Sequence, residues 1–401
     1  MPPPIPTGLR TDFAGGRWPL FRLALVTSIW TVITLGFYRF WMKTRLRRWY
    51  WSSVRPGGLP LEYVGDPLEK LLGFFIAVVI MAFYIGIVNL LLMFASLSLF
   101  GSNVTAYLLS FVGVIPIWFF ARYRARRYVL ARTRWRGVRF GLEPGAWRYA
   151  LHALFHWLVT ILTLGVLWPR KTFYLEKFRT DRTVYGSATL NQSGSWHMLM
   201  MPFVPVIVGV SLMAISTAAI SWGFLTPAEA IWAYVLSTPC LIAGLIHYNV
   251  QATRLLANHK SAGSLGLKSD PKTATVLRVY VFGYIATSLI VVLPLLPILM
   301  VVGMVESAKL SAEWDPNLAE GIAYGVPMWA WTILGAFAYF AVFLMWGVLR
   351  HCFVTMPLWR HYAQTLTITH ETALSTISQK ERDEFEEAEG FAEALDLGAA
   401  I

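Results

Sequence analysis

The sequence runs from Leu71 to Phe100 without a charged side chain, and a second uncharged run extends from Val104 to Ala121. At a rise of about 1.5 Å per residue, the first run is longer than the roughly 30 Å hydrocarbon core of a bilayer. Two such runs joined by a short polar turn predict a transmembrane hairpin. With 56% hydrophobic and only 14% charged residues, the chain as a whole is typical of a membrane protein.

Two further pairs of apolar runs follow the same plan. One pair covers residues 198–220 and 230–247, and the other covers residues 279–302 and 326–349. The tips of the three hairpins contain a single basic residue, Lys309, whereas the other connections hold nearly all the remaining Lys and Arg. Under the positive-inside rule, the tips face out and both termini lie in the cytoplasm.

Two shorter apolar runs carry the same three residues near their ends. The first, Leu23–Tyr38, contains Thr34-Leu35-Gly36, and the second, Ala153–Trp168, contains Thr163-Leu164-Gly165. A helix over the first run is about 24 Å long, which is marginal for a full crossing. Full crossings would also carry the basic residues that follow to the outer side. We therefore expect both helices to be re-entrant or interfacial, with eight full spans as the alternative.

The predicted fold is an all-α polytopic membrane protein with six spans in three hairpins, two short Thr-Leu-Gly helices and an internal duplication. Its predicted segments are an N-terminal cytoplasmic segment (1–19), a first membrane repeat (20–121, short helix 20–40 and hairpin 70–121), a basic connection (122–148), a second membrane repeat (149–248, short helix 149–169 and hairpin 198–248), a cytoplasmic connection (249–277), a third hairpin (278–350) and a cytoplasmic C-terminal segment with an acidic tail (351–401).

Five short polar segments between the membrane runs alternate large and small residues and stop at Gly, Pro or an acid, as short strands do. They are residues 61–67, 138–141, 184–187, 265–268 and 365–369. These segments predict either small cytoplasmic β elements, in the form of a sheet or a set of hairpins, or plain loops.

Arginines and aromatic residues alternate in two segments that follow apolar runs. Because guanidinium groups pair with phosphates while aromatic rings lie at the interface, these segments favour contact with anionic lipid headgroups. The candidate headgroup contacts are Lys43, Arg45, Arg47, Arg48, Arg124, Arg126 and Arg127. The formal net charge of +12 does not indicate nucleic acid, because the basic segments lack a recognisable nucleic-acid-binding module.

Four polar residues in or at the ends of apolar runs are candidates for a polar path. His152 and His156 are spaced i, i+4, so both imidazoles lie on one face of a helix. Asn89 and His247 lie within or at the end of long runs. No cysteine or carboxylate near the histidines completes a metal site, except for Glu143 before the helix, and we expect no metal or cofactor.

The order Phe13-x-Gly15, then Thr34-Leu35-Gly36-Phe37-Tyr38-x-Phe40-Trp41-x-Lys43-x-Arg45, then Gly65 and Gly73 resembles the YjgN-like bacterial inner-membrane proteins. The second Thr-Leu-Gly segment with Trp168 is similar to that family's second half. The resemblance spans roughly residues 13–375. It implies a multi-pass protein of the bacterial inner membrane and no assigned chemistry.

Two classes of function fit these patterns. Prolines interrupt two runs in comparable positions, at Pro202 and Pro205 and at Pro294 and Pro297. Such interruptions and repeats favour a transporter or carrier of a small solute or lipid. The alternative is a non-catalytic scaffold whose basic cytoplasmic face binds anionic lipid or a partner protein, and a homo-oligomer is open in either case. The sequence contains no nucleotide-binding, haem-attachment or metalloprotease motif, and we expect no enzyme.

Overall fold

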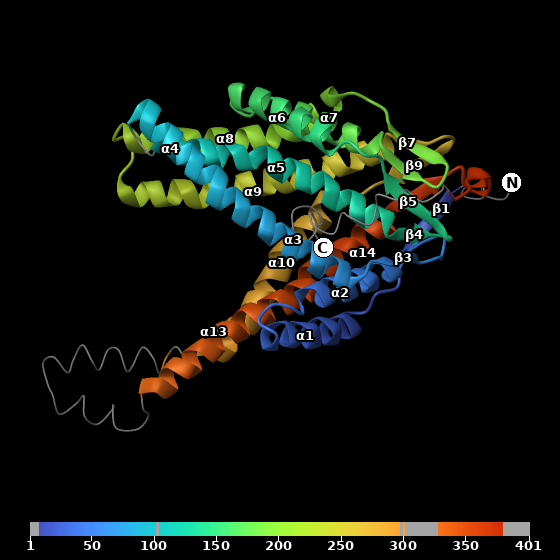
Figure 1. Ribbon diagram of the computed structural model, residues 1–401, viewed down its shortest axis with the longest axis horizontal. Helices are drawn as coiled ribbons and strands as arrows, with labels where there is room; N and C mark the ends of the chain where they lie inside the picture. Colours follow the sequence, from blue (N-terminus) through green and yellow to red (C-terminus); the bar gives the residue numbers. More distant parts are fainter. Residues whose placement is uncertain (1–7, 102–103, 297–299, 301–327, 380–401) are drawn as a thin grey trace, which may run out of the picture. The chain divides into compact units, whose positions relative to one another are not determined.

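The computed structural model describes residues 8–101, 104–296, 300 and 328–379 (Figure 1). The chain divides into two compact units. In the described residues, the first unit comprises residues 8–14, 43–277 and 360–379, and the second comprises residues 15–42 and 278–359.

The first unit contains a ten-stranded antiparallel sheet, so the predicted all-α class with at most small β elements is wrong. The strands follow the order β2-β1-β10-β9-β8-β7-β6-β5-β4-β3. Their bounds are β1 (Gly8–Phe13), β2 (Val54–Pro56), β3 (Leu61–Tyr63), β4 (Thr133–Trp135), β5 (Val138–Leu142), β6 (Thr183–Tyr185), β7 (Ala188–Gln192), β8 (Lys260–Ala262), β9 (Leu265–Ser269) and β10 (Leu366–Thr369).

The sheet nearly closes on itself. Its two end strands, β2 and β3, follow one another in the sequence and contact each other, so the strand order returns to its starting point. Trp135, Tyr185, Leu265 and Ile368 form a buried apolar core on one face. A short 3₁₀ segment, η5 (Glu371–Thr376), packs residues against this core. The sheet therefore resembles a small barrel, with few free edges to expose.

Tight turns join three of the strand pairs. In the β4–β5 turn, Arg136 and Gly137 have φ values of 53° and 77°, as in the mirror-image turns that suit hairpin twist. Gly186 and Gly263 take the corresponding place in the other two hairpins, with φ values of 54° and 61°. Glycine adopts this conformation without strain, so each of the three turns, including the one that begins with Arg136, contains a glycine that favours it locally.

Each of the five predicted polar segments overlaps a strand: β3, β5, β6, β9 and β10. The other five strands were missed. Several of them are only three residues long, which is too short for a period-two pattern to show. The all-α prediction failed because segments this short form a sheet only when distant parts of the chain pair, as Gly8 of β1 does with Thr369 of β10.

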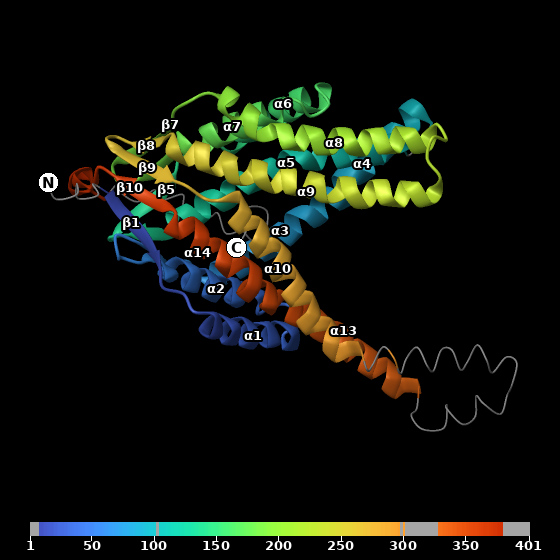
Figure 2. The same ribbon diagram turned by 180° about the vertical axis from the view of Figure 1, so that it is seen from behind.

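The helices of the first unit, shown in Figures 1 and 2, extend from the sheet and return to it. They are α2 (Arg39–Ser53, from Lys43), α3 (Pro67–Phe83), a π-helical segment η1 (Tyr84–Val88), α4 (Asn89–Phe100), α5 (Val104–Ala131), α6 (Ala146–Leu162), α7 (Trp168–Thr180), η2 (Trp196–Leu199), α8 (Met200–Ser221), α9 (Pro227–Asn258), the start of α10 (Thr273–Val292) and the end of α14 (Met356–Gln364).

Helices α8 and α9 run side by side in Figures 1 and 2 and form a closely packed pair. A Cβ atom on Gly209 would lie 2.6 Å from the Cα atom of Leu241, and one on Gly244 would lie 2.7 Å from the carbonyl oxygen of Pro205. Small residues that allow backbones to approach are typical of helix pairs in membranes. Thr226 starts α9 with a capping box completed by Glu229.

The second unit contains α1 (Arg17–Ile33), most of α10, a 3₁₀ segment η3 (Leu293–Leu295), α13 (Met328–Arg350) and a π-helical segment η4 (His351–Thr355). Helix α1 packs on α13 and η4. The rings of Tyr284 and Trp346 stack at 6.2 Å, which places α10 beside α13. The tip of this hairpin, which contains Lys309, lies outside the described residues.

Five helical segments of the described chain are long and apolar enough to cross a membrane: Pro67–Phe100, Trp196–Ser221, Ala228–Asn258, Thr273–Leu295 and Gly335–Gln364. Their side chains are largely exposed, as lipid-facing residues are. The chain is therefore a membrane protein. Neither α1 nor α6, the helices that carry the Thr-Leu-Gly segments, is among the five.

Candidate functional site

The two Thr-Leu-Gly segments form the same turn. Each threonine ends a helix and donates its hydroxyl to a carbonyl oxygen in the preceding turn, at 2.8 Å for Thr34 and 2.9 Å for Thr163. Leu35 and Leu164 both have φ of 50°, and the glycines that follow have φ of 94° and 88°. Both leucines are more than nine-tenths exposed. These turns reverse the chain, so each short helix is the first arm of a helical hairpin, α1–α2 or α6–α7.

The α6–α7 hairpin returns antiparallel to itself. The His152 ring lies 5.3 Å from the Phe178 ring, the His156 ring stacks on Tyr174 at 5.0 Å, and the Trp157 ring contacts the Trp168 ring at 5.5 Å. In the other hairpin, Ser28 Oγ lies 3.6 Å from Met42 Sδ, so the chain reverses there too.

Helix α6 exposes an apolar stripe rather than a polar one. Its buried side chains are Tyr149, Ala150, Ala153, His156 and Thr160. Its exposed large apolar side chains are Trp147, Leu151, Phe155, Leu158, Ile161 and Leu162. Helix α1 shows the same spacing, with Leu20, Ala24 and Thr27 buried. A helix whose outward face is apolar is expected to contact lipid along that face.

The structure brings His152 and His156 together, as their spacing predicts. Their ring centroids are 4.5 Å apart, and His156 Nδ1 lies 3.3 Å from a guanidinium nitrogen of Arg170. Burial, followed by the Arg182 and Arg170 charges, lowers the pKa of His152. Burial, His152 and Arg170 together lower the pKa of His156 to about 4. The pair is therefore neutral near pH 7, and no group of three possible metal ligands lies among the described residues.

A buried lysine beside these histidines was missed by sequence reasoning. Lys171 is 5% exposed, and its Nζ atom lies 3.0 Å from the Trp168 ring centroid and 3.6 Å from that of Trp157. Burial, with a contribution from Arg122, lowers the pKa of Lys171 to about 8. The signal for it was a lysine directly after Trp168-Pro169-Arg170, which we had read only as part of a basic run.

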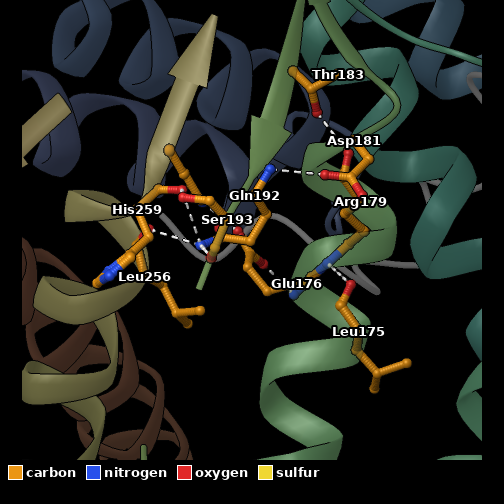
Figure 3. Close-up of polar contacts among 10 residues, drawn as sticks. Leu175, Glu176, Arg179, Asp181, Thr183, Gln192, Ser193, Leu256 and His259 are labelled. Carbon is orange, nitrogen blue, oxygen red and sulfur yellow. Dashed lines mark hydrogen bonds and ion pairs between the residues drawn. The ribbon is translucent and has the colours of Figure 1, made fainter. Parts of the chain in front are cut away.

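A second charged site joins α5, α7 and β8, and Figure 3 shows two of its members, Glu176 and Arg179 of α7. Glu176 Oε1 accepts from Lys260 Nζ at 2.5 Å, and Glu176 Oε2 accepts from Arg179 at 2.6 Å. Arg126 of α5 lies within electrostatic range of both Glu176 and Arg179. We call Arg126, Glu176, Arg179 and Lys260 the charge cluster.

The charge cluster keeps its carboxylate ionised. Burial alone raises the pKa of the Glu176 carboxyl, but the surrounding cations hold that pKa far below its usual range. Burial, opposed in part by Glu176, lowers the pKa of the Arg126 guanidinium. Its Nε atom is buried and has no hydrogen-bond partner among the described residues. Sequence reasoning listed Arg126 only as a headgroup contact and did not connect it to Glu176.

Hydrogen bonds around Gln192 hold the end of β7 beside α7 and α9 (Figure 3). The backbone N–H of Gln192 donates to Asp181 Oδ1 at 2.8 Å, and its side-chain Nε2 donates to the carbonyl oxygen of Leu256 at 3.1 Å. Lys177 pairs with Asp181 at 2.9 Å and also donates to the carbonyl oxygen of Gln192 at 2.8 Å. These bonds position the backbone on either side of the charge cluster.

Three of the seven candidate headgroup contacts, Arg47, Arg126 and Arg127, engage other parts of the protein in largely buried surroundings. Arg47 is 3% exposed and donates to the Tyr63 hydroxyl at 3.2 Å. Arg127 is 7% exposed and donates through Nε to the carbonyl oxygen of Leu142 at 2.9 Å. Arg126 belongs to the charge cluster. These arginines have structural contacts that the sequence pattern did not reveal.

The other four candidate headgroup contacts are more accessible. Arg45 and Arg48 are exposed on α2, and Arg48 also donates to the carbonyl oxygen of Gly65 at 2.9 Å. Lys43 is half-buried, and Arg124 is half-buried beside the Phe120 ring. Contact of any of these residues with lipid stays a prediction.

Asn89 and His247 do not join the histidine pair in any described contact. Asn89 begins α4 directly after the π-helical segment, and its side-chain oxygen is buried without a hydrogen-bond partner among the described residues. His247 of α9 lies 3.4 Å from the Thr273 hydroxyl. The predicted polar path is therefore a set of residues on three separate helices, α4, α6 and α9.

Comparison with known proteins yields one match. A family model described as "Bacterial protein of unknown function (DUF898)" matches residues 8–393. No curated protein and no solved structure matches the chain at a significant level.

Proposed function

Because the chain belongs to the DUF898 family, bacterial proteins of unknown function that include the YjgN-like proteins, we propose a role for it from geometry. The proposal is that it is a non-catalytic protein of the bacterial inner membrane, with both termini cytoplasmic. In this role it binds anionic phospholipids of the inner leaflet through cations beside its two helical hairpins.

The outward apolar stripe of α6 carries this proposal. A helix with lipid-facing apolar residues on a hairpin too short to cross enters one leaflet only. The α7 arm is 13 residues long, about 20 Å, and contains Arg170 and Lys171 in its first turn. Lys171 is buried against Trp157 and Trp168, so the half-buried Arg170 is the cation here that can extend toward the phosphate layer, as long side chains do near the interface.

The sheet supports the one-sided placement of the hairpins. Strands hydrogen-bonded in one sheet lie on one side of a membrane, because lipid-exposed irregular backbone is excluded from the hydrocarbon. Strands β5 and β6 pair directly, so the α6–α7 hairpin between them begins and ends on the same side. Strands β1 and β2 pair as well, which applies the same condition to α1–α2.

Transport, the reading favoured by the proline interruptions, has less support. Helix α8 continues through Pro205, and the carbonyl of Pro205 faces Gly244 at close range. These features account for close packing of α8 on α9 without a substrate path. Pro294 lies in η3, and Pro297 lies outside the described residues. We therefore prefer the lipid-binding scaffold.

The test is the enrichment of anionic lipid around the purified protein. Replacing Arg45 and Arg48 with Gln removes two exposed charges, each contributing about 1 kcal/mol of attraction to an anionic leaflet, so enrichment of phosphatidylglycerol over phosphatidylcholine should fall by about 30-fold at most. Native mass spectrometry of protein from mixed-lipid micelles measures that ratio.

The matched control removes two exposed charges from the sheet, with Arg10 and Lys268 changed to Gln. This control is expected to retain the parent ratio, and the parent ratio itself should fall in high salt because exposed charges are screened. Equal enrichment in the Arg45 and Arg48 variant and in the parent would refute the proposal.

A further inference from the structure

The charge cluster holds more positive than negative charge. Arg126, Arg179 and Lys260 carry three positive charges against the single negative charge of Glu176, a net charge of +2. The nearby carboxylate of Asp181 is already paired with Lys177 at 2.9 Å. An excess of partly buried positive charge is unfavourable unless a counter-charge is present.

Glu176 cannot supply that counter-charge alone. Its two oxygens are engaged separately, one by Lys260 at 2.5 Å and the other by Arg179 at 2.6 Å. Arg126 remains beside this pair, with its Nε atom buried and without a hydrogen-bond partner in the described part of the chain. A buried guanidinium N–H without an acceptor costs free energy, and it is the observation that points to a ligand.

The side chains of the charge cluster are partly exposed to solvent. The side chains of Glu176, Arg179 and Lys260 are 14%, 20% and 18% exposed. The three cations come from three different elements, α5, α7 and β8. A phosphate group accepts several charge-assisted hydrogen bonds at once and suits the fork of an arginine better than a chloride ion does.

We propose that the charge cluster is a binding site for a phosphate group, held by Arg126 together with the outer donors of Arg179 and Lys260. The group belongs either to inorganic phosphate or to the headgroup of a phosphomonoester lipid. The proposal does not depend on the lipid-binding scaffold, because that role rests on exposed arginines of α2 and on the outward face of α6.

The first experiment measures inorganic phosphate binding by calorimetry, with the full chain in phosphatidylcholine nanodiscs and chloride at equal ionic strength as the reference. Replacing Arg126 with Met removes a charge-assisted donor, so affinity for phosphate should fall by about tenfold or more. The matched control is Lys268→Met, an exposed cation on β9, which should keep the parent affinity.

The second experiment tests for a stronger response to phosphate, where the first tests for a weaker one. It does not need a well-folded Arg126 variant. Replacing Glu176 with Gln removes the one carboxylate and raises the net charge of the cluster from +2 to +3. This variant is expected to melt at a lower temperature than the parent in chloride, because its buried cations lose their partner. Phosphate should raise the melting temperature of Glu176→Gln by more than it raises that of the parent.

Nanodiscs that contain phosphatidic acid distinguish the two sources of the group. If the phosphate belongs to a lipid, phosphatidic acid should be retained by the parent and lost from Arg126→Met, and inorganic phosphate should compete with it. If the group is inorganic phosphate, calorimetric binding should be the same with and without phosphatidic acid. The proposal is overturned if neither source shows binding that depends on Arg126, or if phosphate stabilises Glu176→Gln no more than chloride does.

Discussion

The connection of ten strands into one sheet predicts which parts of the chain share a side of the membrane. The turns β6–β7 and β8–β9 and the end of α2 all belong to or adjoin this sheet, so exposed residues in them should be equally accessible. Ser52, Ser187 and Ser264 are exposed representatives of these three places. Ser221, also exposed, lies at the opposite end of α8.

The energetic argument for this arrangement comes from the α6–α7 hairpin. For α6 to cross the bilayer while β5 and β6 stay paired, α7 would have to cross back. Helix α7 is about 20 Å long against about 30 Å of hydrocarbon, and it contains four Lys or Arg residues. At about 2.5–3.5 kcal/mol per charge near the bilayer centre, the crossing would cost on the order of 10 kcal/mol.

The assay is cysteine labelling in intact cells with a membrane-impermeant maleimide. Single cysteines replace Ser52, Ser187, Ser264 or Ser221 in a background where Cys240 and Cys352, the two native cysteines, are changed to Ser and Ala. The first three positions should be protected in intact cells and labelled after lysis.

Ser221→Cys should be labelled in both cases. Any difference in labelling among the first three positions would refute the argument from the sheet. Labelling of all three with protection of Ser221→Cys would instead refute the cytoplasmic placement of the termini.

Three further predictions concern stability. The pKa of His156 is lowered in the folded protein to about 4, so the unfolded chain binds the proton more tightly and stability should fall as pH drops from about 6.5 toward 4. In thermal unfolding, His156→Gln should make this slope shallower, and the remaining slope should include the contribution of His152, whose pKa is lowered as well. Gly209→Ala should cost about 1–3 kcal/mol by overpacking against α9, whereas Gly86→Ala, with no atom within 4 Å of the added carbon, should be far milder in the same unfolding assay. Gly186→Ala should speed hydrogen exchange in η5, because its Cβ would clash with a carbonyl of the C-terminal segment, while Gly263→Ala, equally strained in φ but facing open space, should not.

The candidate site was only partly visible in the sequence. The contact between His152 and His156 follows from a helical period, which is a local property. Arg126 and Arg127 occupy adjacent positions in one basic run, yet one lies beside Glu176 and the other donates to the carbonyl of Leu142. Composition cannot distinguish such neighbours, because their partners come from other elements.

The sequence by itself determined the membrane class, the places of most long apolar helices and the glycines of the two Thr-Leu-Gly segments, but it left open whether the chain reverses there. Hydropathy over a long window and the backbone freedom of glycine are properties of consecutive residues, so they need no tertiary information. The ten-stranded sheet and the charge cluster were decided only by the tertiary structure. Strands of three to six residues do not form alone. Strand β1, near the start of the chain, pairs with β10, near its end. Likewise, Glu176 and Lys260 are 84 residues apart, and their contact exists only in the fold, where β7 is paired with β8.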